Sequence, residues 1–151
     1  MKNASRNRKQ AQQSPLVQYT NIHYHNTCIY CGCPSTCNDH VPPLSRIDDY
    51  MALQPNRPVF LLVPACTRCN SKLSDSLQRS LIERIDSLKD LLQRQLARKG
   101  KTAVWSDKEL NDLGPNLRSM IGAHMVIDNE LQQSIDFECD WNFILEQIEG
   151  L

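Results

Sequence analysis

The pattern of apolar and polar positions predicts a β-hairpin early in the chain. Residues 59–63 are apolar throughout, which is typical of a buried strand. Residues 36–41 form a shorter β-type segment that stops at a pair of prolines, because proline has no backbone N–H to donate to a sheet. We therefore predict two strands joined by a loop over residues 44–58, with Pro64 ending the second strand. An extended segment over residues 19–30 leads into them.

From residue 71 the apolar spacing becomes that of a helix. Apolar residues recur at steps of four and three, at Leu73, Leu77, Leu81, Ile85, Leu88, Leu92 and Leu96. This predicts one long amphipathic helix that ends at Gly100, with its arginines, Arg84 among them, off the apolar stripe. The stripe is longer than the hairpin can cover, so we expect C-terminal helices or a second chain to pack on it.

Further helices are predicted after residue 100. Ser106 and Glu109 form a capping box that opens a helix, and a second helical pattern runs over residues 116–133. Asp140 is placed to cap a last short helix. The expected fold class is therefore α+β, a small hairpin followed by a long helix and a helical C-terminal extension.

This pattern suggests three parts. They are a flexible basic arm over residues 1–18, the hairpin with its long helix over 19–100, and a helical acidic extension over 101–151 that packs on the core or docks on a partner.

Charge is distributed unevenly although the net charge is zero. All 17 Lys and Arg lie in residues 1–118 with 10 of the 17 Asp and Glu, a net charge of +7, and residues 119–151 carry the other 7 acids and no base, a net charge of −7. A basic front is compatible with nucleic acid binding, and an acidic tail with docking on a basic surface. Solvated faces that merely differ in charge explain the asymmetry equally well.

Seven cysteines are present, and no apolar leader precedes them. The longest apolar run, residues 59–65, is far short of a membrane span of about 18 residues. We therefore expect a reduced, cytoplasmic protein that has no membrane partner and whose cysteines bind metal rather than form disulfides.

Two Cys-x-x-Cys knuckles carry the metal prediction. The pairs Cys28/Cys31 and Cys66/Cys69 share one spacing, and four thiolates complete a tetrahedral Zn²⁺ site with no open position, which is typical of a structural zinc. Cys33 and Cys37 follow the first knuckle closely and remain alternative ligands.

Three polar residues between and after the knuckles suggest hydrolytic chemistry. Cleavage of a phosphodiester requires a deprotonated water and neutralisation of the developing charge. His40 is the side chain best suited to activate that water near neutral pH. Asp39 and Asn70 supply hard oxygen ligands for one Mg²⁺ or Mn²⁺. Adjacent strand residues point to opposite faces, so Asp39 and His40 can serve one site only if the strand distorts there.

These motifs together resemble the HNH endonucleases, the zinc-containing branch of the ββα-metal nucleases. The resemblance covers Cys-x-x-Cys, Asp-His-Val-Pro-Pro and Leu-Leu-Val-Pro-Ala-Cys-x-x-Cys-Asn with a Lys two residues on, under a third of the chain. It implies DNA hydrolysis, with His40 as general base, Asp39 and Asn70 as ligands of a catalytic Mg²⁺ or Mn²⁺, and the knuckle cysteines around a structural zinc. Lys72 matches a basic position of the family that would contact phosphate, and Arg68 is a further candidate for contact with the nucleic acid. The chain departs from the family at Leu61, where a middle asparagine is expected.

Two wider hypotheses follow. A small HNH unit with a helical extension resembles effectors of bacterial or phage defence, so the helical part is a candidate to bind an ATPase partner subunit or to form a homodimer. The alternative is a non-catalytic zinc-binding interaction module that assembles with a partner through its helical half.

Overall fold

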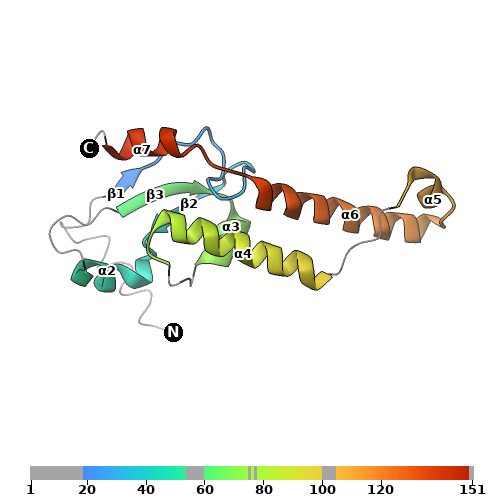
Figure 1. The fold of residues 1–151 in the computed structure, drawn as a ribbon, viewed down its shortest axis with the longest axis horizontal. Helices are drawn as coiled ribbons and strands as arrows, with labels where there is room; N and C mark the ends of the chain where they lie inside the picture. Colours follow the sequence, from blue (N-terminus) through green and yellow to red (C-terminus); the bar gives the residue numbers. More distant parts are fainter. Residues whose placement is uncertain (1–18, 54–59, 75, 77, 100–104, 150–151) are drawn as a thin grey trace. The chain divides into compact units, whose positions relative to one another are not determined.

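The computed structural model describes residues 19–53, 60–74, 76, 78–99 and 105–149. The predicted basic arm and the predicted boundary at residue 100 lie outside these residues. The α+β class is confirmed, since the described part of the chain contains one three-stranded mixed sheet and six α-helices (Figure 1). The strands are β1 (Tyr19–Asn21), β2 (Cys37–Val41) and β3 (Phe60–Ala65), and the helices are η1 (Leu44–Arg46, 3₁₀), α2 (Ile47–Leu53), α3 (Thr67–Leu73), α4 (Leu81–Lys99), α5 (Asp107–Asn111), α6 (Pro115–Asp136) and α7 (Trp141–Glu149).

The chain forms two compact units. The first comprises the described residues up to Leu88 together with the segment from Glu138 onward, and the second comprises Lys89–Phe137. The first unit holds the sheet, α3 and α7, and the boundary between the units falls within α4. No described helix is long and apolar enough to cross a membrane.

The predicted pair of strands is confirmed as β2 and β3, which pair antiparallel from Cys37↔Ala65 to Val41↔Leu61. The prediction of a loop over residues 44–58 is wrong for its first part, because η1 and α2 occupy residues 44–53. β3 is central, with β1 parallel on its other side. The prediction that Pro64 ends the strand is wrong, because β3 continues through it. The Pro64 carbonyl accepts from the Ile29 N–H (3.0 Å), so the proline nitrogen faces away from β2 and its missing N–H breaks no bond of the hairpin.

The prediction of one helix from residue 71 to 100 is also wrong, because α3 ends at Leu73 and α4 begins at Leu81. A capping box at Ser80 starts the second helix. The Ser80 hydroxyl accepts from the Glu83 N–H (3.2 Å), and the Glu83 carboxylate accepts from the N–H groups of Ser80 (3.3 Å) and Arg79 (3.0 Å). The Ser-x-x-Glu spacing was the sequence signal for this start.

The apolar stripe itself is confirmed as core. Its described members are mostly buried within the chain, namely Leu73, Leu81, Ile85, Leu88 and Leu92. The chain itself therefore covers these side chains.

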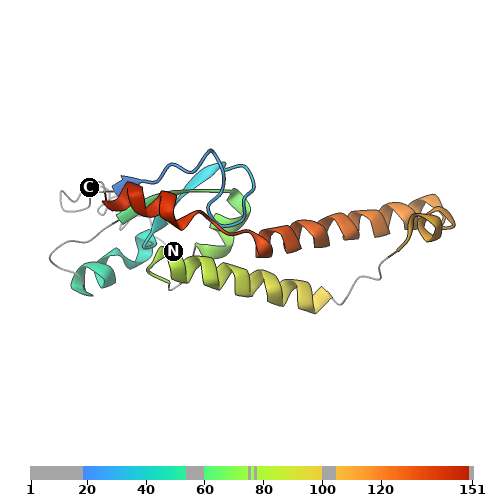
Figure 2. The same ribbon diagram turned by 45° about the horizontal axis from the view of Figure 1, so that its top comes forward.

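The C-terminal predictions hold. The capping box at Ser106 opens α5, and the helix predicted over residues 116–133 appears as α6. Asp140 caps α7 by accepting from the Phe143 N–H (3.1 Å). In both ribbon views α7 lies beside β1 and the loop after it (Figures 1 and 2). The Asp140 N–H donates to the Tyr24 hydroxyl (2.8 Å), which links the start of α7 to the loop after β1 within the first unit.

Candidate functional site

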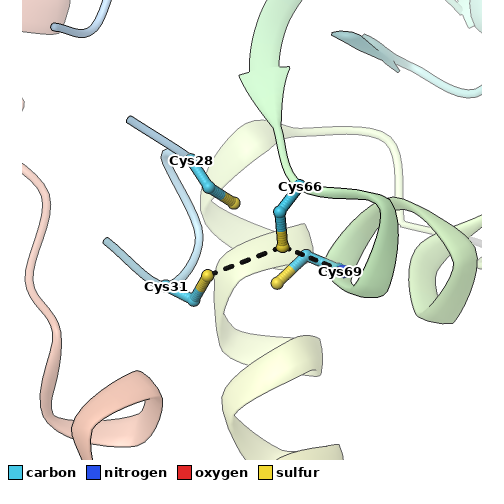
Figure 3. Close-up of side chains that lie close together, drawn as sticks. All are labelled: Cys28, Cys31, Cys66 and Cys69. Carbon is cyan, nitrogen blue, oxygen red and sulfur yellow. Dashed lines mark hydrogen bonds between the residues drawn. The ribbon is translucent and has the colours of Figure 1, made fainter. Parts of the chain in front are cut away.

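A cluster of four buried cysteines joins the first loop to the start of α3. Cys28 and Cys31 flank a turn that Gly32 closes at φ 74°, a backbone conformation that favours glycine. Cys66 is the N-cap of α3, and Cys69 lies in its first turn. Figure 3 shows the four side chains directed toward one another from these two segments.

The spacing of the sulfurs suits zinc. All four Sγ atoms lie within 4.8 Å of one another, and those of Cys31 and Cys66 are 3.7 Å apart. Tetrahedral Zn–S bonds of about 2.3 Å place sulfurs about 3.8 Å apart. The cluster can therefore hold a zinc ion after small movements of the side chains, and four thiolates leave the ion no open coordination position.

Hydrogen bonds between the thiols favour ionisation of Cys28 and oppose that of Cys69. Hydrogen bonds from Cys31 and Cys69 lower the pKa of Cys28 to about 4, and the same sharing raises the pKa of Cys69. Burial alone would lower the pKa of Arg68, but its hydrogen bond to Cys31 and the negative charge of the cluster raise it. The negative charge of the cysteine cluster therefore balances the guanidinium of Arg68, which we predicted to contact nucleic acid.

The two alternative ligands lie outside the cluster. Cys33 is exposed, and partial burial of its thiol together with the neighbouring Cys31 raises its pKa to about 11. The Cys37 thiol instead donates to the Ala65 carbonyl (3.3 Å). The metal cluster consequently comprises the two Cys-x-x-Cys pairs alone among the described residues.

Asp39 is buried and fully engaged by a partner that we did not predict. Arg84 donates from Nη2 to both Asp39 oxygens (3.0 and 2.8 Å) and from Nε to Oδ2 (3.1 Å). The Tyr30 hydroxyl donates to the same Oδ2 (2.6 Å). Burial and the charge of Asp39 raise the pKa of Tyr30 well above its usual range. Arg84 is 0% exposed, and it also donates to the Ser76 hydroxyl (2.7 Å).

The prediction that Arg84 lies off the apolar stripe is wrong. It follows Leu81 by three residues and precedes Leu88 by four, which places it on the buried face of α4. That spacing is visible in the sequence. Burial of an arginine at this position is unfavourable unless a carboxylate compensates its charge, and Asp39 of β2 provides that carboxylate.

His40 lies on the opposite face of β2 from Asp39. The register between β2 and β3 is unbroken over all five pairs, so successive side chains alternate between the faces of the sheet. His40 makes an edge-to-face contact with Tyr19, with ring centroids 5.2 Å apart. The strand distortion needed to bring Asp39 and His40 to one site is therefore absent from this part of the sheet.

Asn70 lies on α3 close to the start of β2. Its amide nitrogen donates to the Cys37 sulfur (3.5 Å) and to the Asn38 carbonyl (3.4 Å). Asp39, His40 and Asn70 thus belong to neighbouring elements without converging on one point. Because Arg84 occupies both oxygens of Asp39, the predicted ligand pair Asp39 and Asn70 does not fit a divalent ion in this arrangement.

Two further positions singled out in the sequence, Lys72 and Leu61, lie on α3 and β3. Lys72 is exposed in the last turn of α3. Leu61 is buried in β3, opposite Val41. Comparison with family models, curated proteins and solved structures finds no match. The resemblance to HNH endonucleases therefore rests on the sequence motif itself.

Proposed function

We propose that this chain is a zinc-stapled endonuclease of the HNH type that hydrolyses phosphodiester bonds in DNA. The observation that carries the proposal is the order of elements around the cysteine cluster. An antiparallel hairpin runs directly into a short helix, the Asp-His pair lies on the first strand, and the cluster closes the joint between β3 and α3. The motif therefore lies on the hairpin and helix that an HNH motif requires, and this supports the nuclease proposal.

Zinc has a structural role in this proposal. A buried ion with four thiolate ligands has no position for water or substrate, so its contribution is folding free energy. The cluster fixes the loop before β2 against the first turn of α3, and this holds Asn70 and Lys72 beside the hairpin.

His40 is the general base of the proposed reaction. Its side chain is only partly buried, and the contact with Tyr19 limits how the imidazole can rotate. A neutral imidazole accepts a proton of the attacking water as the water oxygen bonds to phosphorus. The bond from phosphorus to the 3′ oxygen breaks in the same displacement, and the departing oxygen takes a proton from solvent. Because Asp39 is held by Arg84, we assign no step to a divalent ion, and Asp39 acts on the fold rather than on the substrate.

A second candidate function is a non-catalytic zinc module that binds a partner protein. The observation that favours it is the separation of the three polar residues, with Asp39 buried against Arg84 and His40 on the other face. In this alternative His40 is a packing residue of the sheet edge.

Plasmid cleavage distinguishes the two candidates. Supercoiled plasmid is incubated with the wild type, His40→Ala, and the matched control His124→Ala, an exposed histidine of the second unit. Each protein is tested with Mg²⁺, with Mn²⁺ and without either ion, after its zinc content has been measured. The nuclease proposal expects nicking or linearisation that only His40→Ala abolishes. Intact plasmid with every protein, at one zinc per chain, favours the non-catalytic module.

A further inference from the structure

A cavity of about 520 Å³ opens on the sheet face that carries His40. Its walls come from the segment after β1, the start of β2 and the centre of β3, and its lining residues are Asn21, Ile22, His23, Tyr24, His25, Asn26, Ser35, Asn38, Leu62 and Pro64. Asn38 is two residues before His40 on β2, and Leu62 is the direct partner of His40 on β3. Because alternate strand residues share a face, the cavity and the His40 imidazole lie on the same side of the sheet.

The lining is neutral and rich in hydrogen-bonding groups. It contains no Asp, Glu, Lys or Arg. Three asparagine side chains, those of Asn21, Asn26 and Asn38, are exposed, and no hydrogen bond within the described part of the chain engages their amides. Leu62 and Pro64 supply apolar surface from β3. Such a lining suits a neutral, flat group that carries both donors and acceptors, and it contains no Lys or Arg whose fixed positive charge could balance a phosphate.

The loop that forms one wall is held in a fixed shape. His25 and Asn26 both adopt left-handed backbone conformations, with φ of 45° and 54°. The Ser35 N–H donates to the Asn26 carbonyl (2.9 Å), and the His25 ring stacks on Phe143 of α7 with centroids 4.9 Å apart. These contacts fix the position of the wall before any ligand binds, which lowers the entropy lost on binding.

We propose that this cavity binds an unpaired nucleobase of the nucleic acid substrate. The proposal rests on the proposed nuclease function. Residues two apart on a strand are about 6.6 Å apart, so a nucleotide whose phosphate lies at His40 can place its base beside Asn38. An asparagine amide pairs with a base edge through one donor and one acceptor, and an unpaired base exposes edges that a duplex hides. The substrate is therefore a bulged, flipped or single-stranded site rather than a fully paired duplex.

Binding to two labelled DNA probes tests this. Fluorescence anisotropy compares a duplex that contains one bulged adenine with the same duplex fully paired, and every protein carries His40→Ala so that cleavage cannot interfere. We expect at least fivefold tighter binding of the bulged duplex, the low end for one base held by a paired amide. Adding Asn38→Ala or Asn21→Ala removes this preference. Adding Asn129→Ala, an exposed asparagine of α6, leaves it unchanged.

Equal affinity for the two duplexes, or a preference that survives both cavity substitutions, overturns the cavity assignment. Cleavage of the same bulged duplex by the protein with intact His40 reports separately on the nuclease. Cleavage of this duplex without tighter binding of it than of the paired duplex overturns the cavity alone, and a bulge preference that depends on Asn38 without cleavage of either the plasmid or the bulged duplex overturns the nuclease alone.

Discussion

The buried pair of Asp39 and Arg84 gives the sharpest quantitative prediction. Asp39→Asn keeps the size of the side chain and an acceptor for the Tyr30 hydroxyl, but it removes the charge that Arg84 neutralises. Arg84 is 0% exposed, so no water can replace the lost partner. Removal of one member of a buried ion pair costs about 3–5 kcal/mol, because the other charge stays buried without compensation. We expect a loss of this size from the free energy of unfolding.

This loss is a large part of the total stability, which is about 5–15 kcal/mol for a typical domain. Arg84→Met is expected to lower the free energy of unfolding by a similar amount, because the buried Asp39 carboxylate then has no positive charge to compensate it. The double variant Asp39→Asn/Arg84→Met removes both charges, so its loss is expected to be several kcal/mol smaller than that of the two single variants added together.

Urea unfolding followed by far-UV circular dichroism measures these free energies at neutral pH with zinc present. The matched control is Asp90→Asn with Arg94→Met, an ion pair on α4 with a similar distance (2.7 Å) whose side chains are 62% and 57% exposed. An exposed pair at this spacing contributes about 0.3–0.5 kcal/mol. A loss below about 1 kcal/mol for Asp39→Asn, close to that of the control, would refute the structural role of Asp39. A Mg²⁺-dependent stabilisation that disappears in Asp39→Asn would refute it as well, since it would make Asp39 a metal ligand.

Two further predictions concern the zinc cluster and the start of α4. Cys66→Ser is expected to lower the zinc content measured by atomic absorption and to unfold the first unit, whereas Cys139→Ser, outside the cluster, keeps one zinc per chain. For Glu83, hydrogen bonds from the N–H groups of Arg79 and Ser80 lower the carboxyl pKa below its ordinary value of 4.5. The contribution of the Glu83 carboxylate to the capping box is therefore complete above pH 4.5 and is lost as the pH falls through the lowered pKa. The stability difference between wild type and Glu83→Gln should shrink toward acid pH, and a difference that stays constant from neutral to acid pH would contradict this.

The sequence by itself determined the features that depend on residues close together in the chain. The Cys-x-x-Cys spacing predicted the ligand pairs, since a single turn brings both thiols to one ion, although only the structure placed Cys33 and Cys37 outside the cluster. The apolar run of β3 required burial, and the capping boxes at Ser80 and Ser106 defined helix starts through contacts across three residues. The break between α3 and α4 was therefore predictable in principle, although the continuous leucine spacing hid it.

Only the tertiary structure decided the surroundings of the polar residues. Asp39 and Arg84 are 45 residues apart, and their pairing depends on how α4 packs against β2. The separation of Asp39 from His40 depends on an unbroken register with β3, which no property of the two adjacent residues sets. Local spacing specifies which side chains a turn or helix presents, whereas the choice of partner for a buried charge is made when distant elements exclude water from it, and that occurs only in the folded chain.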